Sequence, residues 1–398
     1  MNNSYTYIII GAGITGLSIA FAIKKHQPGA QILILEKEEV TGFHASGRNS
    51  GVLHAGFYYT ADSLKAKFTV AGSRAMKEYC RRKNLPLNEC GKLVVAQNED
   101  ELTKLYELEK RGKTNGSNVS IIDESRAAEI EPNVRTFKKA LYSPETAGID
   151  PKLVCTSLKN DLEQAGVRFL FSTRYLNHTG NILETTQGKF EGKKIINCSG
   201  LYADQIAQDF GFGRKYTIIP FKGLYLKYTK NKTDVKTNIY PVPNLKNPFL
   251  GVHFTKTVTG DIKIGPTAIP ALWRENYFSS TNFNLSEFVD IFCQEAKLFL
   301  TNAFGFRDLA FEEMKKYDKK YFISLAQKMV QHIDEKGFTE FTQPGIRAQL
   351  LNKKSLNLVQ DFILEGDTKS IHILNAVSPA FTCTFPFGEY VVKHYILP

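Results

Sequence analysis

The chain has 398 residues, of which 42% are hydrophobic and 23% charged, and a formal net charge of +11. This length is enough for two domains, and the composition is that of a globular protein. No run of 18 apolar residues predicts a membrane-spanning helix, and the N-terminus lacks the basic stretch that begins a signal peptide. Six scattered cysteines without a C-x-x-C pair argue against zinc or a disulfide framework, and predict a reducing, cytoplasmic setting with no metal.

The excess of positive charge allows three interpretations. It is the charge of a lysine-rich surface, of a protein that attracts an anionic substrate, or of one that touches the inner face of an anionic membrane. Nucleic acid is not expected as a partner, because the basic clusters carry no nucleic-acid module.

The first 37 residues carry the strongest pattern in the chain. An apolar run at Tyr7–Ile10 leads into a helical pattern through three glycines in G-x-G-x-x-G spacing: Gly11, Gly13 and Gly16. A second apolar run, Ile32–Leu35, ends on Glu36. In a βαβ dinucleotide fold the glycines permit a tight turn, close approach of a pyrophosphate and helix–strand packing, and the acid binds a ribose. The segment therefore predicts a dinucleotide site at the N-terminus of the first helix.

A long loop rich in glycine, histidine and asparagine follows at residues 41–56. A loop of this length inside a compact fold is usually functional. It contains Arg48, Asn49 and Ser50, which can donate to phosphate or to a ring, and His54, for which a buried structural role is the alternative.

Apolar periodicity predicts the remaining elements in chain order. The expected helices are Leu64–Lys83, Leu102–Arg111, Leu153–Gln164, Phe288–Ala303 and Leu325–His332. The expected strands are Cys90–Gln97, Val167–Phe171, Lys194–Asn197 and Ile371–Leu374. Between Pro220 and Gly265, short aromatic and β-branched runs predict an antiparallel sheet. Nucleotide-type elements thus stand at the start, middle and end of the chain, which predicts a discontinuous cofactor domain.

Several blocks, in order, resemble the L-2-hydroxyglutarate dehydrogenases and oxidases, FAD enzymes of the D-amino-acid oxidase-like family. The blocks are GRNSGVLHAGFYY (Gly47–Tyr59), SLKAKF (Ser63–Phe68), CGKLVVA (Cys90–Ala96), TAGIDP (Thr146–Pro151), NCSGLYAD (Asn197–Asp204), IYPVP (Ile239–Pro243), PFLGVHFT (Pro248–Thr255), PGIRAQ (Pro344–Gln349) and NAVSPA (Asn375–Ala380). The resemblance implies an α/β fold: a discontinuous Rossmann-like FAD-binding domain with an inserted α+β substrate domain based on an antiparallel sheet. We expect the former at residues 1–88, 146–215 and 340–398, and the latter at 89–145 and 216–339.

The resemblance also implies which residues bind FAD. They are Gly11, Gly13, Gly16, Glu36 and Lys37 at the ADP half, Arg48, Asn49, Ser50 and Gly51 at the pyrophosphate and flavin, Ser199 and Gly200 at a second turn, and Pro379, Ala380, Phe381 and Thr382. The last four would place a helix N-terminus near the pyrimidine edge of the flavin, where a positive dipole stabilises the reduced cofactor. His44 resembles a position at which some flavoproteins attach FAD covalently. The alternative is a histidine that supports a neighbouring site residue or faces solvent.

For the chemistry, the resemblance implies oxidation of L-2-hydroxyglutarate to 2-oxoglutarate by hydride transfer to flavin N5. His54 would take the hydroxyl proton and Arg347 would grip a carboxylate with its fork. Lys222 and His253 are candidates for the second carboxylate of this small anionic 2-hydroxy dicarboxylate. A surface ion pair is the alternative role of Arg347.

Departures from the family pattern leave the substrate open. Lys222 stands where the family has Arg, Leu224 where it has an acid, and Thr267 where it has Asn. An amino acid or glycerol 3-phosphate is an alternative substrate, and a non-catalytic flavin- or NAD-binding protein is an alternative of another class. Quinone or oxygen is the expected electron acceptor, with peripheral membrane contact as a further expectation.

Overall fold

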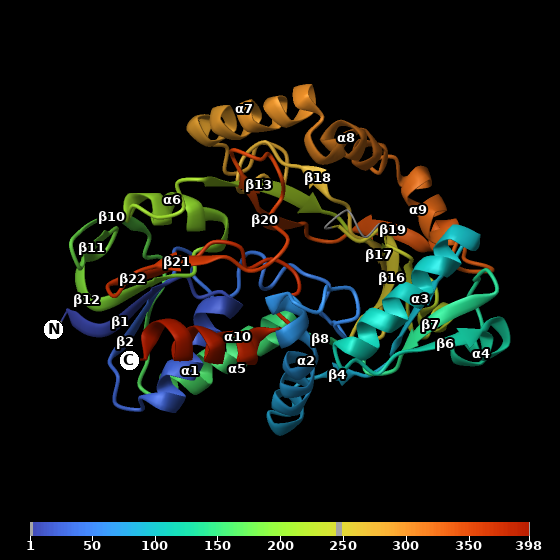
Figure 1. Cartoon of the computed structure of the whole chain (residues 1–398), viewed down its shortest axis with the longest axis horizontal. Coiled ribbons are helices and arrows are strands. Elements are labelled where there is room, and N and C mark those ends of the chain that lie inside the picture. Colours follow the sequence, from blue (N-terminus) through green and yellow to red (C-terminus); the bar gives the residue numbers. More distant parts are fainter. Residues whose placement is uncertain (1–2, 244–248, 398) are drawn as a thin grey trace. The chain divides into compact units, whose positions relative to one another are not determined.

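The computed structural model describes residues 3–243 and 249–397, which form two compact units (Figure 1). Unit 1 consists of Met1–Asn49, Pro151–Pro220 and Arg347–Pro398. Unit 2 consists of Ser50–Asp150 and Phe221–Ile346. In the described residues no helix has the length and apolar character needed to cross a bilayer.

Unit 1 is built on a largely parallel sheet. Its strands are β1 (Ser4–Ile10), β2 (Ile32–Leu35), β9 (Arg168–Leu170), β10 (Tyr175–Thr179), β11 (Ile182–Thr185), β12 (Gly188–Asn197), β21 (Leu364–Gly366) and β22 (Ser370–Ile373). Its helices are α1 (Ile14–His26), α5 (Pro151–Gln164), α6 (Ala203–Asp209) and α10 (Thr384–Val391). The order β22-β12-β1-β2-β9 is parallel throughout, and the β10–β11 hairpin continues the sheet beside the first half of β12. Helices α1, α5 and α10 lie on one face of this sheet and α6 on the other (Figure 1).

The sequence of unit 1 explains this doubly covered sheet. Strands with helices on both faces read as continuous apolar runs rather than alternating ones. Ile8, Ile9 and Leu33 are accordingly fully buried, with Ile8 level with Leu33 in the register. Glycine at position 388 lets α10 lie directly on α1, because a β-carbon there would stand 2.3 Å from the Ser18 Oγ atom.

Unit 2 is built on a mainly antiparallel sheet. Its strands are β3 (Val52–Leu53), β4 (Leu87–Asn88), β5 (Lys92–Val95), β6 (Ser120–Asp123), β7 (Lys139–Ser143), β8 (Ala147–Ile149), β14 (Leu226–Tyr228), β15 (Asn238–Pro241), β16 (His253–Lys256), β17 (Ile262–Gly265), β18 (Ile269–Pro270) and β19 (Phe338–Phe341). Its helices are α2 (Leu64–Arg82), α3 (Glu99–Thr114), α4 (Glu124–Ile130), α7 (Leu285–Thr301), α8 (Phe306–Lys315) and α9 (Lys319–Gln327). The main sheet has the order β19-β14-β17-β16-β15-β5-β7-β6 and is antiparallel except between β15 and β5. Strands β13 (Tyr216–Gly223) and β20 (Gly345–Asn352) run across the division between the units.

Alternation along β5 divides the core of unit 2 in two. Successive side chains of a strand point to opposite faces of its sheet. Leu93 and Val95 therefore join one buried cluster, and Val94 and Ala96 join another. All four are fully buried, so this strand is covered on both faces.

The expected fold class is confirmed, since a Rossmann-like parallel sheet and an antiparallel sheet with helices are both present. The observed division differs from the expected one at residues 50–88, which we expected in the cofactor domain. They belong to unit 2 because β3 and β4 pair with β8, and because Phe57 is buried in one cluster with Leu105 of α3.

The helix expected over Leu325–His332 is wrong in position. The observed α9 begins at Lys319, where the side chain of Asp318 caps the backbone N–H of Lys320, and it ends at Gln327. Val330 then forms a β-bridge with Val134, which an α-helix through this residue would prevent.

Candidate active site

The turn between β1 and α1 leaves no room for side chains at Gly11 and Gly16. Gly11 has φ +108°, and a β-carbon there would lie 2.5 Å from the Cys198 carbonyl oxygen. A β-carbon on Gly16 would lie 2.1 Å from the carbonyl oxygen of Gly11, so helix and strand meet through this glycine. Gly13 precedes α1, whose first turn has no acidic residue. The positive end of the helix dipole therefore has no carboxylate of its own first turn beside it, as an anion site requires.

Glu36 stands directly after β2 and is buried. Its Oε2 accepts the Ala12 N–H at 2.8 Å, and its Oε1 accepts the Glu38 N–H at 3.0 Å. Burial raises the pKa of this carboxyl, and the two backbone donors oppose that shift. The carboxyl is thus held against the glycine turn, where a ribose of a dinucleotide is expected.

The loop after Glu36 folds back onto the glycine turn. The Ser46 Oγ atom accepts the Ile14 N–H at 2.9 Å, which satisfies a donor of the first helical turn. Arg48 donates from Nε to the Phe43 carbonyl at 2.8 Å, and Asn49 donates to the Ser46 carbonyl at 2.8 Å. Two of the four residues expected at the pyrophosphate and flavin therefore brace their own loop.

The other two residues of that stretch belong to unit 2. The Ser50 Oγ atom accepts the Val52 N–H at 3.3 Å, and Gly51 has φ +75°. The Gly51 carbonyl accepts the Ile149 N–H at 2.8 Å, so this end of the loop is tied to the sheet of β3 and β8.

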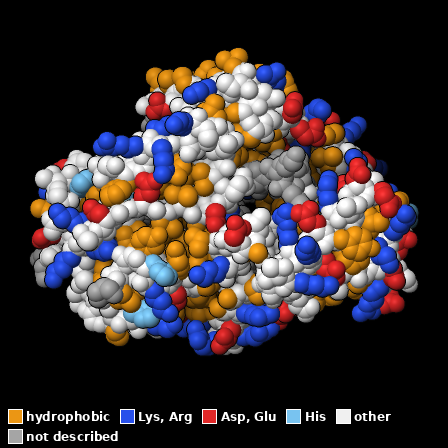
Figure 2. Space-filling view, in the orientation of Figure 1, with side chains coloured by type: hydrophobic (Ala, Val, Ile, Leu, Met, Phe, Trp, Pro, Cys, Tyr) orange, Lys and Arg blue, Asp and Glu red, His pale blue; other side chains and the backbone are white. Residues whose placement is uncertain are grey.

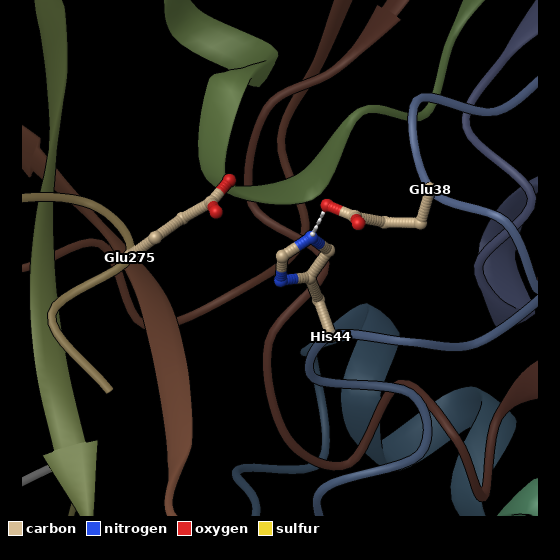
Figure 3. Close-up of side chains that lie close together, drawn as sticks. All are labelled: Glu38, His44 and Glu275. Carbon is tan, nitrogen blue, oxygen red and sulfur yellow. Dashed lines mark hydrogen bonds and ion pairs between the residues drawn. The ribbon is translucent and has the colours of Figure 1, made fainter. Parts of the chain in front are cut away.

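His44 forms an ion pair within the same loop of unit 1. Its Nε2 lies 2.8 Å from Oε1 of Glu38 (Figure 3). The hydrogen bond from His44 and the ammonium of Lys37 lower the pKa of Glu38 to about 2. Glu275, the third residue drawn, belongs to unit 2, where it accepts a hydrogen bond from Asn282 at 3.0 Å.

The second predicted turn lies beside the first. Ile10 of β1 pairs with Asn197 of β12, so both strands end at the same edge of the sheet. Asn197 Oδ1 accepts the Ser199 hydroxyl at 2.6 Å and the Ser199 N–H at 3.2 Å, and Gly200 follows with φ +58°. Ser199, Gly200 and the glycine turn are thus brought together, as a site at the carboxyl ends of parallel strands requires.

The C-terminal segment forms a tight turn before α10. The backbone N–H of Cys383 donates to the Pro379 carbonyl at 3.0 Å, and α10 begins at Thr384. Pro379 and Thr382 are buried, whereas Ala380 and Phe381 are partly exposed. The structure therefore supplies the helix N-terminus that was expected after these four residues.

Arg347 is the first residue of the last segment of unit 1. It lies on β20, is partly exposed, and is followed by the buried Gln349. The other residues assigned to substrate chemistry belong to unit 2.

His54 stands directly after β3 and is buried. Burial, and to a smaller extent the positive charge of Lys92, lower the pKa of its imidazole to about 3. The ring is therefore neutral at physiological pH, the state in which an imidazole can accept a proton.

The three departures from the family pattern form one hydrogen-bonded group. The Thr267 hydroxyl donates to the Lys222 carbonyl at 2.9 Å and accepts the Leu224 N–H at 2.9 Å. Lys222 is buried and donates from Nζ to the Asn276 side-chain oxygen at 3.1 Å, and burial lowers the pKa of its ammonium. Thr267 thus fixes the strand that carries Lys222.

His253 is buried on β16 and held by a ring and by the backbone. Its imidazole stacks on Tyr240 with 3.6 Å between the ring centroids, and its Nδ1 lies 2.8 Å from the Gly251 carbonyl oxygen. The block that contains His253 begins at Pro248, which lies outside the described residues.

Residues 6–393 match the FAD dependent oxidoreductase (DAO) family, so the chain belongs to that family and is an FAD-dependent oxidoreductase that requires an electron acceptor. Curated relatives are more specific. The chain is 33% identical to an L-2-hydroxyglutarate dehydrogenase of Indibacter alkaliphilus, over 98% of this chain and 100% of the relative. It is 32% identical to the L-2-hydroxyglutarate dehydrogenase of Escherichia coli K12, over 98% of this chain and 92% of the relative.

Solved structures share the fold. A dithionite-reduced L-alpha-glycerophosphate oxidase from Mycoplasma pneumoniae with FAD bound has a TM-score of 0.76 and 20% identity, over 98% of this chain and 94% of that chain. A glycine oxidase from Geobacillus kaustophilus has a TM-score of 0.69 and 17% identity, over the same shares of the two chains.

The residues of unit 1 fit FAD. A dinucleotide needs a turn without side chains, an anion-binding helix start and an acid for the ribose. Gly11, Gly13 and Glu36 supply these within one edge of the sheet, and the Ser199–Gly200 turn adjoins them.

For two buried residues of unit 2 the sequence predicted no function. Lys92 and Tyr240 both lie in family-like blocks, but no role was assigned to either. The available signal was a lysine inside an otherwise apolar strand, KLVV, where burial of an ammonium is unfavourable.

Proposed function

We propose that the chain is an FAD-dependent L-2-hydroxyglutarate dehydrogenase, which oxidises the C2 hydroxyl to the ketone of 2-oxoglutarate. The observation that carries the proposal is His54, a buried imidazole that directly follows β3 in the loop block shared with the family. The relatives that cover nearly the whole chain are L-2-hydroxyglutarate dehydrogenases. FAD, when bound, supplies the acceptor for the hydride that leaves C2.

Each step assigned to the chain uses a named side chain. His54 accepts the hydroxyl proton as the carbonyl forms. Arg347 binds the carboxylate next to C2 with two parallel N–H groups, which fixes its orientation better than a lysine would. Lys222, oriented by Asn276, and His253, oriented by the Gly251 carbonyl, are assigned to the second carboxylate.

The glycine turn, Glu36, Lys37, the loop residues Arg48–Gly51, the Ser199–Gly200 turn and residues 379–382 are assigned to FAD. We further propose that FAD is bound without a covalent link to His44, because its Nε2 already pairs with Glu38. Acid precipitation tests this: a yellow supernatant is expected, and a yellow pellet would contradict it.

An anaerobic titration tests the substrate. FAD-loaded enzyme is mixed with L-2-hydroxyglutarate, lactate, glycerol 3-phosphate and amino acids, and bleaching of the flavin is followed. We expect L-2-hydroxyglutarate to bleach the flavin fastest. Faster bleaching by glycerol 3-phosphate or an amino acid would assign another substrate, and no bleaching by any of them would favour a non-catalytic protein.

We also propose that unit 2 makes peripheral contact with an anionic membrane. Large hydrophobic side chains are exposed on α7 and α8: Leu285, Val289, Phe292, Leu300, Phe311 and Met314. Figure 2 shows hydrophobic side chains gathered over α7, with lysines and arginines beside them. An exposed apolar helix face can enter a lipid surface, and the net charge of +11 of the whole chain favours an anionic one.

Vesicle sedimentation tests the membrane contact. The wild type should sediment with phosphatidylglycerol vesicles and not with phosphatidylcholine vesicles, and Phe292→Ser with Leu300→Ser should abolish it. Leu176→Ser, at an exposed leucine of unit 1, is the control. Equal binding by all variants, or a dimer that the double variant dissolves, would contradict the contact. Membrane binding would favour a quinone as the electron acceptor, and oxygen uptake during turnover would identify oxygen instead.

A further inference from the structure

One cation of unit 2 is buried without an opposite charge beside it. Lys222 of β13 is 8% exposed, and its Nζ donates to the side-chain oxygen of Asn276 at 3.1 Å. Among residues 3–243 and 249–397, no carboxylate forms an ion pair with this ammonium. An unpaired charge in the interior costs free energy, and an anion bound beside it would offset that cost.

The strand around Lys222 supplies no acid that could neutralise it. Residues 220–226 contain no aspartate or glutamate. Across the strand pair, Lys222 is in register with Ile269 of β18, and residues directly opposite one another in an antiparallel pair are neighbours on one face. The neighbours of this ammonium along and across the strand are therefore uncharged.

Asn276 holds the ammonium with a neutral group. Its Oδ1 accepts the hydrogen bond from Lys222, its Nδ2 donates to the Ser279 carbonyl at 3.0 Å, and its backbone N–H donates to the Trp273 carbonyl at 3.1 Å. The acceptor on one side and the donor on the other fix which way the amide faces. An ammonium has three N–H donors, so two of them remain for a ligand once Asn276 has accepted one.

A carboxylate in place of this amide would have a different effect. It would accept the same hydrogen bond from Lys222, but it would also neutralise the ammonium. The amide leaves the full charge available, and the low dielectric of a buried site strengthens the attraction between that charge and an anion. Burial also lowers the pKa of this ammonium, and a ligand carboxylate brought beside it would favour the charged form again. Asn276 is thus suited to a lysine that binds an anionic ligand.

We infer that Asn276 is a positioning residue that determines specificity: its neutral amide orients Lys222 and leaves that ammonium uncompensated, so that the pair selects a substrate with a second carboxylate. The inference rests on the proposed function, in which Lys222 binds the second carboxylate. It adds that the charge at position 276, as well as that of Lys222, determines the preference for a dicarboxylate. A substrate that ends in a methyl group would leave the ammonium buried and unpaired, and would bind more weakly for that reason.

The test compares two substitutions that differ in charge. Asn276→Asp keeps an acceptor for Lys222 and adds a negative charge, whereas Asn276→Leu has a similar size and neither property. Both variants lose the donor to Ser279, so that loss cancels in the comparison. Calorimetric titration of the oxidised, FAD-loaded enzyme measures the affinity for glutarate and for butyrate, a dicarboxylate and a monocarboxylate that have no C2 hydroxyl to oxidise. Ser280→Asp, which adds the same charge at an exposed position nearby in the chain, is the control.

The wild type should bind glutarate more tightly than butyrate. Asn276→Asp should weaken glutarate binding by about tenfold or more and Asn276→Leu by about threefold, with butyrate little changed in either. Thermal unfolding should rank the two variants in the opposite order, because the aspartate pairs with Lys222 and the leucine leaves the ammonium without a partner. A residue that only stabilised the fold would give the same order in both measurements. Ser280→Asp should match the wild type in its affinity for glutarate.

Turnover separates the inference from the proposed function. With L-2-hydroxyglutarate as substrate, Asn276→Asp should raise KM with little change in kcat, as loss of ground-state binding does. Loss of the glutarate preference in Asn276→Asp, with no flavin bleaching by L-2-hydroxyglutarate, would leave the role of Asn276 standing and overturn the proposed substrate. Bleaching by L-2-hydroxyglutarate with an unchanged glutarate preference in Asn276→Asp would overturn the inference. An equal loss in Ser280→Asp, equal binding of the two acids by the wild type, or failure of both Asn276 variants to fold would also overturn it.

Discussion

The two units differ in some of their buried ionisable groups, although buried carboxylates are paired in both: Glu131 of unit 2 accepts the Thr237 N–H at 3.0 Å. In unit 1, Glu36 accepts two backbone N–H groups and Asp204 accepts the Ile218 N–H at 2.9 Å. In unit 2, Lys92 and one oxygen of Glu295 are buried without hydrogen-bond partners. A binding site needs fixed donors and acceptors, whereas a proton-transfer site needs groups whose protonation is displaced from its ordinary range. The contrast therefore separates cofactor binding from acid–base chemistry.

Gly16→Ala should break the cofactor side of this contrast, with the largest effect of the changes considered. The new β-carbon would lie 2.1 Å from the backbone carbonyl of Gly11, which cannot move without disrupting β1. We expect loss of FAD and destabilisation of about 4 kcal/mol or more, the range of severe single substitutions. Flavin absorbance and thermal unfolding measure both. Gly29→Ala is the control, since no atom lies within 4 Å of its β-carbon position; loss of FAD there too would contradict the argument.

His54→Ala should break the catalytic side and leave the cofactor side intact. Loss of a general base lowers the rate about 10²–10⁴-fold. Stopped-flow flavin reduction should fall by that factor while FAD remains bound. His332→Ala, at an exposed histidine of unit 2, is the control. If His54→Ala instead loses FAD, or reduces its flavin as fast as the wild type does, the histidine is structural.

The same contrast explains which features the sequence could predict. The dinucleotide site depends on neighbours along the chain: three glycines, a helix start and an acid after a strand. Such local requirements leave a readable pattern, and the dinucleotide site was predicted from it, whereas FAD and the two-domain fold were implied by the resemblance to a family. Ser63 and Asn98, which cap α2 and α3, follow equally local rules.

Unit 2 was less predictable because its site residues meet through strand pairing. Lys222, Leu224 and Thr267 were noted as separate departures, and only the structure shows that one threonine hydroxyl bonds both of the other two backbones. Lys92 and Tyr240 come together because β5 pairs with β15 across more than a hundred residues. Spacing along the sequence contains no trace of that register.

Arg347→Lys should sharpen the comparison by testing a residue of unit 1 that we assign to substrate rather than cofactor. Lysine keeps the charge but loses the fork, so kcat/KM should fall by at least about tenfold with FAD retained. Arg307→Lys, on an exposed helix of unit 2, is the control. Lactate, which lacks the second carboxylate, should reduce the flavin of the wild type more slowly than L-2-hydroxyglutarate. Equal rates with the two acids would contradict a dicarboxylate site.

Glu295→Gln tests the contrast through the pH dependence of stability, with no expected effect on catalysis. Burial on the inner face of α7 raises the pKa of Glu295 to about 8. At neutral pH the folded protein therefore keeps this carboxyl protonated, whereas the unfolded chain ionises it. A raised pKa gives stability that is present at low pH and lost as the pH rises toward 8. The glutamine cannot ionise, so the variant should lie close to the wild type near pH 5 and exceed it by up to about 4 kcal/mol at pH 8. Urea unfolding at the two pH values measures the difference.

Glu312→Gln is the control, because its hydrogen bond to Tyr321 lowers the pKa of Glu312 and leaves no such pH-dependent gain. If the variant and the wild type lose stability in parallel between the two pH values, Glu295 is ionised in the folded protein. Burial would then not suffice to keep this carboxyl protonated, and the contrast between the units would lose one of its two examples.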